Sequence, residues 1–133
     1  MKLATNIVAG LFGLMFLFGG LFFFFGTLPP GPPEDSLPGK FMAAFGPTGY
    51  MAFIKVLEII GGALVAVPKT RNLGLLILGP IVINILCFHG FVVKGGFGGA
   101  HAFITIAALF LLWTERQAFA GLVIRPTAPE PAK

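Results

Sequence analysis

The chain has 133 residues, of which 56% are hydrophobic and 11% are charged, and its formal net charge is +4. Soluble globular domains carry about 25% charged residues, so this composition excludes an ordinary soluble domain and indicates one membrane-embedded domain. The positive charge is small and scattered, which excludes a nucleic-acid-binding surface.

Cys87 is the only cysteine in the chain. A single thiol excludes an intramolecular disulfide, a CxxC redox pair and a cysteine-built metal cage. Because Cys87 lies in an apolar run, we expect it to be a small buried packing residue.

The first apolar run covers residues 7–25 and contains no charged residue. At about 1.5 Å per residue, a helix of this length nearly spans a hydrocarbon core of ~30 Å, and no small-residue cleavage site follows it. We therefore expect a retained transmembrane helix. Four glycines of this run are expected to allow close approach of neighbouring helices: Gly10, Gly13, Gly19 and Gly20.

Residues 26–49 form a proline-rich connection, which cannot stay helical in lipid because proline lacks a backbone donor. Within it we expect one short interfacial turn over residues 41–45, ended by Gly46 and Pro47. Two interpretations of the segment remain open: a solvent-exposed connection, or a lid over the mouth of the helices.

The second helix is predicted over residues 50–67, YMAFIKVLEIIGGALVAV, and ends at Pro68. This run is long enough to cross a bilayer, yet it contains Lys55 and Glu58. A charged residue near the middle of a membrane helix costs about 3 kcal/mol on insertion scales, so such residues usually face a polar partner or a cavity. Lys55 and Glu58 are three residues apart and are therefore expected to be neighbours on one helix surface.

The third helix is predicted over residues 73–93, with a kink at Pro80. A short polar turn separates it from the second helix, so the two are expected to be antiparallel neighbours. A fourth helix over residues 99–116 completes a membrane domain of residues 1–117, and residues 118–133 are expected to form a polar tail.

The predicted fold is all-α, a transmembrane four-helix bundle in which both termini lie on one side. The basic residues assign that side to the cytoplasm of a bacterium, and the chain to its inner membrane as a multi-pass protein. Apart from Lys55, six basic residues fall on the side of the termini and two on the other: Lys2, Lys69, Arg71, Arg116, Arg125 and Lys133 against Lys40 and Lys94.

This topology places the polar residues of the helices in the outer half of the membrane, whereas the inner half is expected to be nearly devoid of polar groups. The candidate polar pocket consists of Lys55, Glu58, Asn84 and His89, with His101 at the outer start of the fourth helix. Asn84 and His89 are five residues apart, roughly 140° around a helix, so at most one is central unless the kink at Pro80 adjusts the geometry.

Three interpretations of these residues remain open. In the first, Lys55 reaches the outer interface and Glu58 is tied to it or to Asn84, which locks the helices together. In the second, the pocket binds a quinone head group or a small polar ligand, or passes protons. In the third, His89 or His101 is an axial ligand of haem or chlorophyll. We expect no metal site, because ligands are scarce.

Over most of its length to Trp113, the chain resembles the DoxX-like family of small four-helix membrane proteins. The resemblance rests on residues in a distinctive order: Lys55, Glu58, Gly61 and Gly62 in the second helix, Lys69, Thr70 and Arg71 in the turn, and Pro80, Asn84 and His89 in the third helix.

The resemblance implies a four-helix transmembrane bundle with Glu58, Asn84 and His89 in its pocket. It also implies a redox-associated or quinone-linked subunit acting with partner proteins, since members of the family have been linked to thiosulfate:quinone oxidoreductase and to complexes handling oxidative stress. We expect no thiosulfate oxidation here, because the chain lacks a cysteine pair, and we do not expect the chain to be an enzyme on its own.

Two alternatives differ from this function. The chain could be a non-catalytic accessory subunit that packs through its phenylalanine-rich faces against a larger respiratory or photosynthetic membrane complex. It could also be a small-solute transporter, which would require an oligomer because four helices are few. In each case the expected partners are the lipid bilayer and other membrane subunits or further copies of the chain.

Overall fold

The computed structural model describes residues 1–26, 30–94 and 98–123. Every regular element within these ranges is helical, which confirms the predicted all-α class. In chain order the elements are α1 (Lys2–Phe25), α2 (Leu37–Phe45), the 3-10 turn η1 (Gly46–Thr48), α3 (Tyr50–Ala66), α4 (Arg71–Cys87), the π-helix η2 (Phe88–Val93), α5 (Gly99–Thr114) and α6 (Arg116–Val123).

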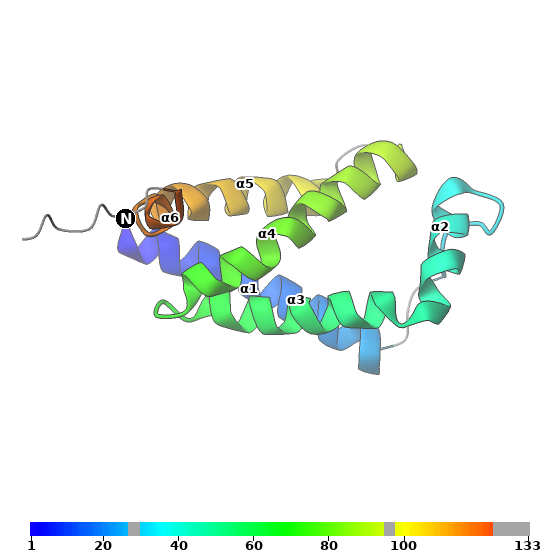
Figure 1. The fold of residues 1–133 in the computed structure, drawn as a ribbon, viewed down its shortest axis with the longest axis horizontal. Helices are drawn as coiled ribbons and strands as arrows, with labels where there is room; N and C mark the ends of the chain where they lie inside the picture. The colour runs from blue at the N-terminus through cyan, green and yellow to red at the C-terminus, as the bar shows by residue number, and fades with distance from the viewer. Residues whose placement is uncertain (27–29, 95–97, 124–133) are drawn as a thin grey trace, which may run out of the picture.

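The four longest of these helices pack in a closed order: α1 against α3, α3 against α4, α4 against α5, and α5 against α1. α3 and α4 are joined by a tight turn and diverge from it, and α2 lies crosswise at the far end (Figure 1). We call the end with Met1, the α3–α4 turn and the α5–α6 junction the N end, and the opposite end the α2 end.

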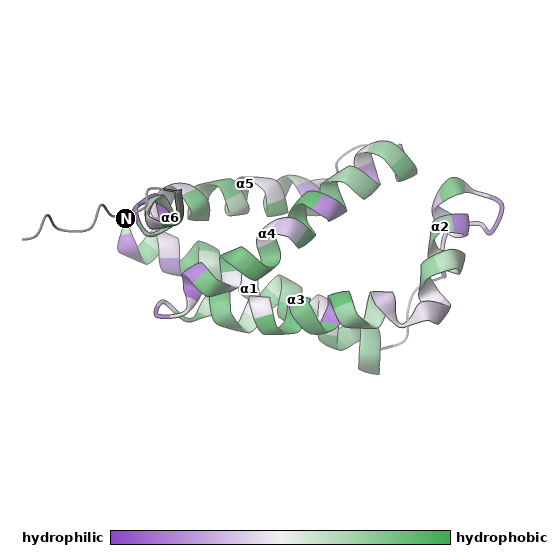
Figure 2. Cartoon of the chain, in the orientation of Figure 1, coloured by the Kyte–Doolittle hydropathy of each residue, from purple (hydrophilic) through white to green (hydrophobic). Residues whose placement is uncertain are grey.

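Two helical segments are long and apolar enough to cross a membrane, Lys2–Phe25 and Arg71–Val93. Two further pairs of consecutive helical segments pass the same test only when the two members of a pair are counted as one span. The first pair is Leu37–Thr48 with Tyr50–Ala66, bent by 84°, and the second is Gly99–Thr114 with Arg116–Leu122, bent by 75°. By length and composition the described residues therefore offer two to four membrane-spanning segments, and their helices are mostly apolar along their length (Figure 2).

The buried core is small and consists of side chains from α1, α3, α4 and α5. Its largest fully buried members are Phe12, Leu78, Leu111 and Val65. By contrast, Phe18, Phe25 and many other large apolar side chains are exposed. A soluble monomer rarely exposes so much contiguous apolar surface, whereas a bilayer accommodates it without cost.

Glycine allows the backbones of α1 and α3 to approach each other directly. A Cβ atom on Gly13 would collide with the carbonyl oxygen of Gly62, and one on Gly62 would lie 2.5 Å from the carbonyl oxygen of Gly13. A Cβ atom on Gly20 would lie 2.9 Å from the carbonyl oxygen of Lys55. The predicted role in close helix approach is thus confirmed for Gly13 and Gly20. A Cβ on Gly10 or Gly19 would meet nothing within 4 Å, so these two glycines make no close helix contact among the described residues.

Several boundaries differ from the predicted ones. The first helix begins at Lys2, well before the apolar run, and the third begins at Arg71 rather than at residue 73. Residues 116–123, partly assigned to a polar tail, form α6 instead, because Phe119 packs against the core. The rest of the predicted tail, residues 124–133, lies outside the described residues.

The connection between the first two long helices contains more structure than the expected single turn. α2 begins at Leu37, where the Ser36 hydroxyl accepts a hydrogen bond from the Gly39 N–H at 3.1 Å and caps the helix. α2 then crosses to η2, where the rings of Phe41 and Phe88 lie 4.9 Å apart. The segment therefore bridges α3 and η2 at the α2 end.

The glycine contact between α1 and α3 gives a direct stability test. Gly13→Ala is expected to lower the free energy of unfolding by about 1–3 kcal/mol, because the added methyl group has no space. Gly10→Ala, one helix turn away in open space, should be neutral or stabilising by up to ~1 kcal/mol through helix propensity. Thermal unfolding followed by circular dichroism in detergent measures both, and equal midpoints for the two variants would contradict the packing.

Candidate functional site

Lys55 and Glu58 form an ion pair on one face of α3. The Lys55 Nζ atom lies 2.8 Å from Glu58 Oε2 and 3.0 Å from Glu58 Oε1. The Glu58 side chain is only 5% exposed, whereas that of Lys55 is 23% exposed. The pair is therefore buried on its acidic side and accessible on its basic side.

The close approach of α1 helps to enclose this pair. Gly20 places the α1 backbone against the Lys55 carbonyl, in the helix turn that carries both charges. An ammonium group has three donors, and Glu58 takes two of them, so one N–H of Lys55 is left for another acceptor. The pair can thus donate a further hydrogen bond from Lys55 to a bound group.

His89 and His101 meet at the α2 end, although they come from η2 and α5. Their ring centres are 3.7 Å apart, and the ring planes are inclined by 43°. His89 Nδ1 lies 2.8 Å from the carbonyl oxygen of Ile85, which accepts a hydrogen bond from it and leaves Nε2 as the unprotonated nitrogen of the neutral ring. His101 Nδ1 is buried and has no hydrogen-bond partner among the described residues.

The spacing of the two rings bears on the predicted tetrapyrrole ligands. A metal bound from opposite sides by two imidazoles, at about 2 Å from each nitrogen, keeps those nitrogens about 4 Å apart and the ring centres further apart. His89 and His101 are too close for that arrangement. Each could serve only singly as an axial ligand. Among the described residues there is no group of three or more metal-binding side chains.

Asn84 does not join either pair. Asn84 is exposed on α4. Cys87 is exposed on the same helix, so the expectation that Cys87 is a buried packing residue is wrong. The physical reason is the helical period. The buried positions of α4 centre on Leu78, and at 100° per residue Asn84 lies about 120° and Cys87 about 180° from it. The single predicted pocket is therefore divided into two separate pairs and one outward-facing amide.

Two hollows in the surface lie away from these residues. One is a shallow, open depression along α1 and its C-cap: Phe18, Gly19, Leu21, Phe22, Phe25 and Gly26. A second, of about 370 Å³, lies at the N end: Met1, Lys2, Thr5, Asn6, Pro68, Arg71, Thr114, Glu115 and Arg116. Neither is lined by Lys55, Glu58, Asn84 or His89.

Arg71 at the N end is a buried polar centre that was not predicted. Its side chain is 5% exposed, and it donates to Glu115 Oε1 at 3.1 Å, to Asn6 Oδ1 at 2.8 Å and to the Val65 carbonyl at 3.4 Å. These partners belong to α1, to α3 and to the α5–α6 junction. The expectation of a half nearly devoid of polar groups is therefore wrong.

The sequence contains a signal for this centre. Assigning Arg71 to a polar turn counted it as a solvated charge, whereas α4 starts at Arg71 and directs it inward. Among residues 1–123, Glu115 is the only acidic residue that the predicted helix ends place at the N end. An arginine and a single acid at the same end of the helices indicate a pair.

The Arg71 centre predicts a specific loss of stability. Arg71→Lys is expected to lower the free energy of unfolding by about 2 kcal/mol, because lysine lacks the planar fork that reaches three acceptors at once. Lys69→Gln, at an exposed position in the same turn, should change it by less than ~0.5 kcal/mol. Chemical unfolding in detergent measures both, and a stable Arg71→Lys protein would mean that the three hydrogen bonds contribute little.

No family model matches the chain, and no solved structure is similar to it. One curated relative is the uncharacterized protein YwoB of Bacillus subtilis, which is 32% identical over 73 residues, or 55% of this chain. The chain spans 47% of the length of that relative. The comparisons assign no family, and the DoxX-like resemblance stays a prediction.

Proposed function

We propose that this chain is a DoxX-like, multi-pass protein of the bacterial inner membrane, a quinone-linked or redox-associated subunit that acts with partner proteins. In this proposal α1, α3, α4 and α5 form a transmembrane four-helix bundle with both termini in the cytoplasm. The observation that carries the functional part is the buried Lys55–Glu58 pair in an otherwise apolar helix.

The membrane topology is supported by where the charges lie. Four basic residues lie at the N end, in the chain start, the α3–α4 turn and the α5–α6 junction: Lys2, Lys69, Arg71 and Arg116. Basic residues accumulate on the cytoplasmic side of membrane proteins. The bent pairs fit a bilayer as well, with α2 and α6 lying along the two surfaces and α3 and α5 crossing between them.

The geometry of the Lys55–Glu58 pair favours a functional role over helix locking. Both residues belong to α3, and their hydrogen bonds to each other stay within that helix. A pair that held the bundle together would cross between helices, as the Arg71 centre does. Charged groups inside a membrane that do not connect helices are usually functional, because their desolvation is costly.

The chemistry available to the pair suits a quinone head group. The free N–H of Lys55 would donate to a ring carbonyl oxygen and favour negative charge there, while Glu58 would supply or accept the proton. A lipid-soluble quinone reaches this depth through the bilayer, and the 23% exposure of Lys55 leaves the ammonium group within its reach. The partner protein would deliver the electrons.

Glu58→Gln tests this role, because the amide keeps the shape of the side chain but removes its charge and its proton-holding capacity. We expect normal membrane insertion and a loss of affinity for decylubiquinone of about tenfold, equivalent to ~1.4 kcal/mol. Equilibrium dialysis of the detergent-solubilised protein measures the affinity. Glu34→Gln, at an exposed carboxylate, is the matched control. Unchanged binding by the Glu58 variant would refute the quinone site.

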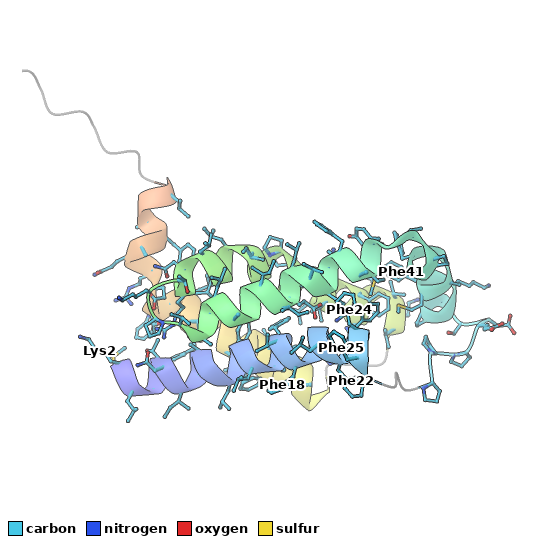
Figure 3. All side chains as sticks on the ribbon, turned by 90° about the horizontal axis from the view of Figure 1, so that it is seen from below. Lys2, Phe18, Phe22, Phe24, Phe25 and Phe41 are labelled. Atoms are coloured by element: carbon cyan, nitrogen blue, oxygen red, sulfur yellow. The ribbon has the colours of Figure 1, made fainter. Side chains whose placement is uncertain are left out.

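A second function, an accessory subunit of a larger respiratory or photosynthetic complex, is favoured by one surface. Phe18, Phe22 and Phe25 are 63%, 53% and 85% exposed and lie on one side of α1 around the open Gly19 (Figure 3). Large rings beside a glycine gap are suited to packing against another membrane helix.

The accessory role predicts co-purification with subunits of such a complex from native membranes in mild detergent. Replacing Phe22 and Phe25 together by Ala should lower the recovery of these subunits, because it removes the rings that the partner would contact. Leu109→Ala, at an exposed position on α5, is the control. Mass spectrometry identifies the recovered proteins, and recovery of the chain alone would argue against this role.

A further inference from the structure

The outward face of α4 carries polar groups in an apolar surface. Pro80, Asn84 and Cys87 are exposed along this face, flanked by Leu76 and Ile83, which are 47% and 64% exposed. Within the described residues the Asn84 carboxamide forms no hydrogen bond, and its exposure leaves its donors and acceptor directed away from the chain. With the chain inserted in a membrane as proposed above, this face of α4 would contact the hydrocarbon chains of the lipids.

Hydrocarbon offers no partner to these groups. A carboxamide has two donors and an acceptor, and leaving them without partners in an apolar medium is strongly unfavourable. Pro80 lies on the same face and has no N–H to donate to the Leu76 carbonyl one turn earlier. Both features indicate that something other than lipid covers this part of α4.

We propose that α4 packs against α4 of a second copy of this chain, with the two Asn84 carboxamides hydrogen-bonded to each other. Two copies inserted with the same orientation are related by a two-fold axis along the membrane normal, which sets each residue of the contact opposite itself. An amide is its own complement across such an axis, because each donates an N–H to the oxygen of the other. The proposal rests on the membrane insertion proposed above.

The ability of Asn84 to pair with itself favours a second copy of the chain over lipid or a charged partner. Lipid chains supply neither donor nor acceptor, and the exposed face carries no charged residue that would select a partner of opposite charge. Polar side chains of this kind are known to join membrane helices through hydrogen bonds between them. The surrounding leucine and isoleucine side chains would provide the apolar part of the contact.

Cys87 is a natural reporter of this contact. It is exposed, it is the only cysteine in the chain, and it follows Asn84 by about one helix turn on the same face. In a two-fold contact through α4, the Cys87 thiols of two copies lie near each other. Disulfide formation requires Cα atoms within about 7 Å, so oxidation or a short bis-maleimide reagent reports this proximity.

The experiment uses the full chain in native membranes that have been washed with alkaline carbonate. Copper-phenanthroline oxidation followed by non-reducing electrophoresis should give a covalent dimer of the chain, absent in Cys87→Ser. Asn84→Leu should lower the crosslinked fraction about threefold or more, whereas Asn84→Gln should largely retain it. A matched control replaces Ile106, exposed on α5, by cysteine in the Cys87→Ser background and should give little dimer.

Each other outcome overturns the inference. Crosslinking that is unaffected by Asn84→Leu, or equally strong from position 106, would indicate random collision. A crosslink to a different protein would indicate another occupant. A chain that stays in the washed membrane, whose Cys87 reacts with a maleimide but forms no dimer, would refute the α4 pairing alone. Release of the chain by carbonate would refute the proposed membrane insertion as well.

Discussion

The contact between α1 and α3 determines where the rest of the chain can lie. Gly13 and Gly62 bring the two backbones together without intervening side chains, and Gly20 extends this contact to the turn that carries Lys55. Close backbone approach gives many dispersion contacts per unit length, which is the main source of association energy when the surroundings are themselves apolar. Burial of Glu58 in α3 follows from this geometry.

The two ends of the molecule are held differently. At the N end, the Arg71 guanidinium joins α1, α3, α4 and the α5–α6 junction through directional hydrogen bonds. At the α2 end, α3 and α4 have diverged, and the elements meet through rings, such as Phe41 on Phe88 and His89 on His101. Ring contacts have weaker directional preferences than a three-acceptor fork, so we expect most of the conformational freedom at the α2 end.

The sequence was sufficient to predict the helical class, the approximate helix positions and the adjacency of Lys55 and Glu58, because these depend on apolar length and on the helical period. It did not predict which face of each helix is buried. Depth alone predicts a place for Asn84 in a pocket, whereas the period of the buried residues around Leu78 directs it outward. Arg71 was missed because its partners are distant in sequence, and only the packing brings Asn6 and Glu115 to it.

The two ion pairs have different consequences for the order of assembly. Lys55 and Glu58 belong to the same turn of α3, so their charges can neutralise each other as soon as that helix forms, before any neighbour arrives. Arg71 reaches its full set of acceptors only when α1, α3 and α5 are all in place. α3 is therefore nearly neutral as an independent helix, whereas the start of α4 keeps an unsatisfied cation until the last helix docks. The arginine thus makes completion of the fold cooperative, and a chain truncated before Glu115 would retain an uncompensated charge at its N end.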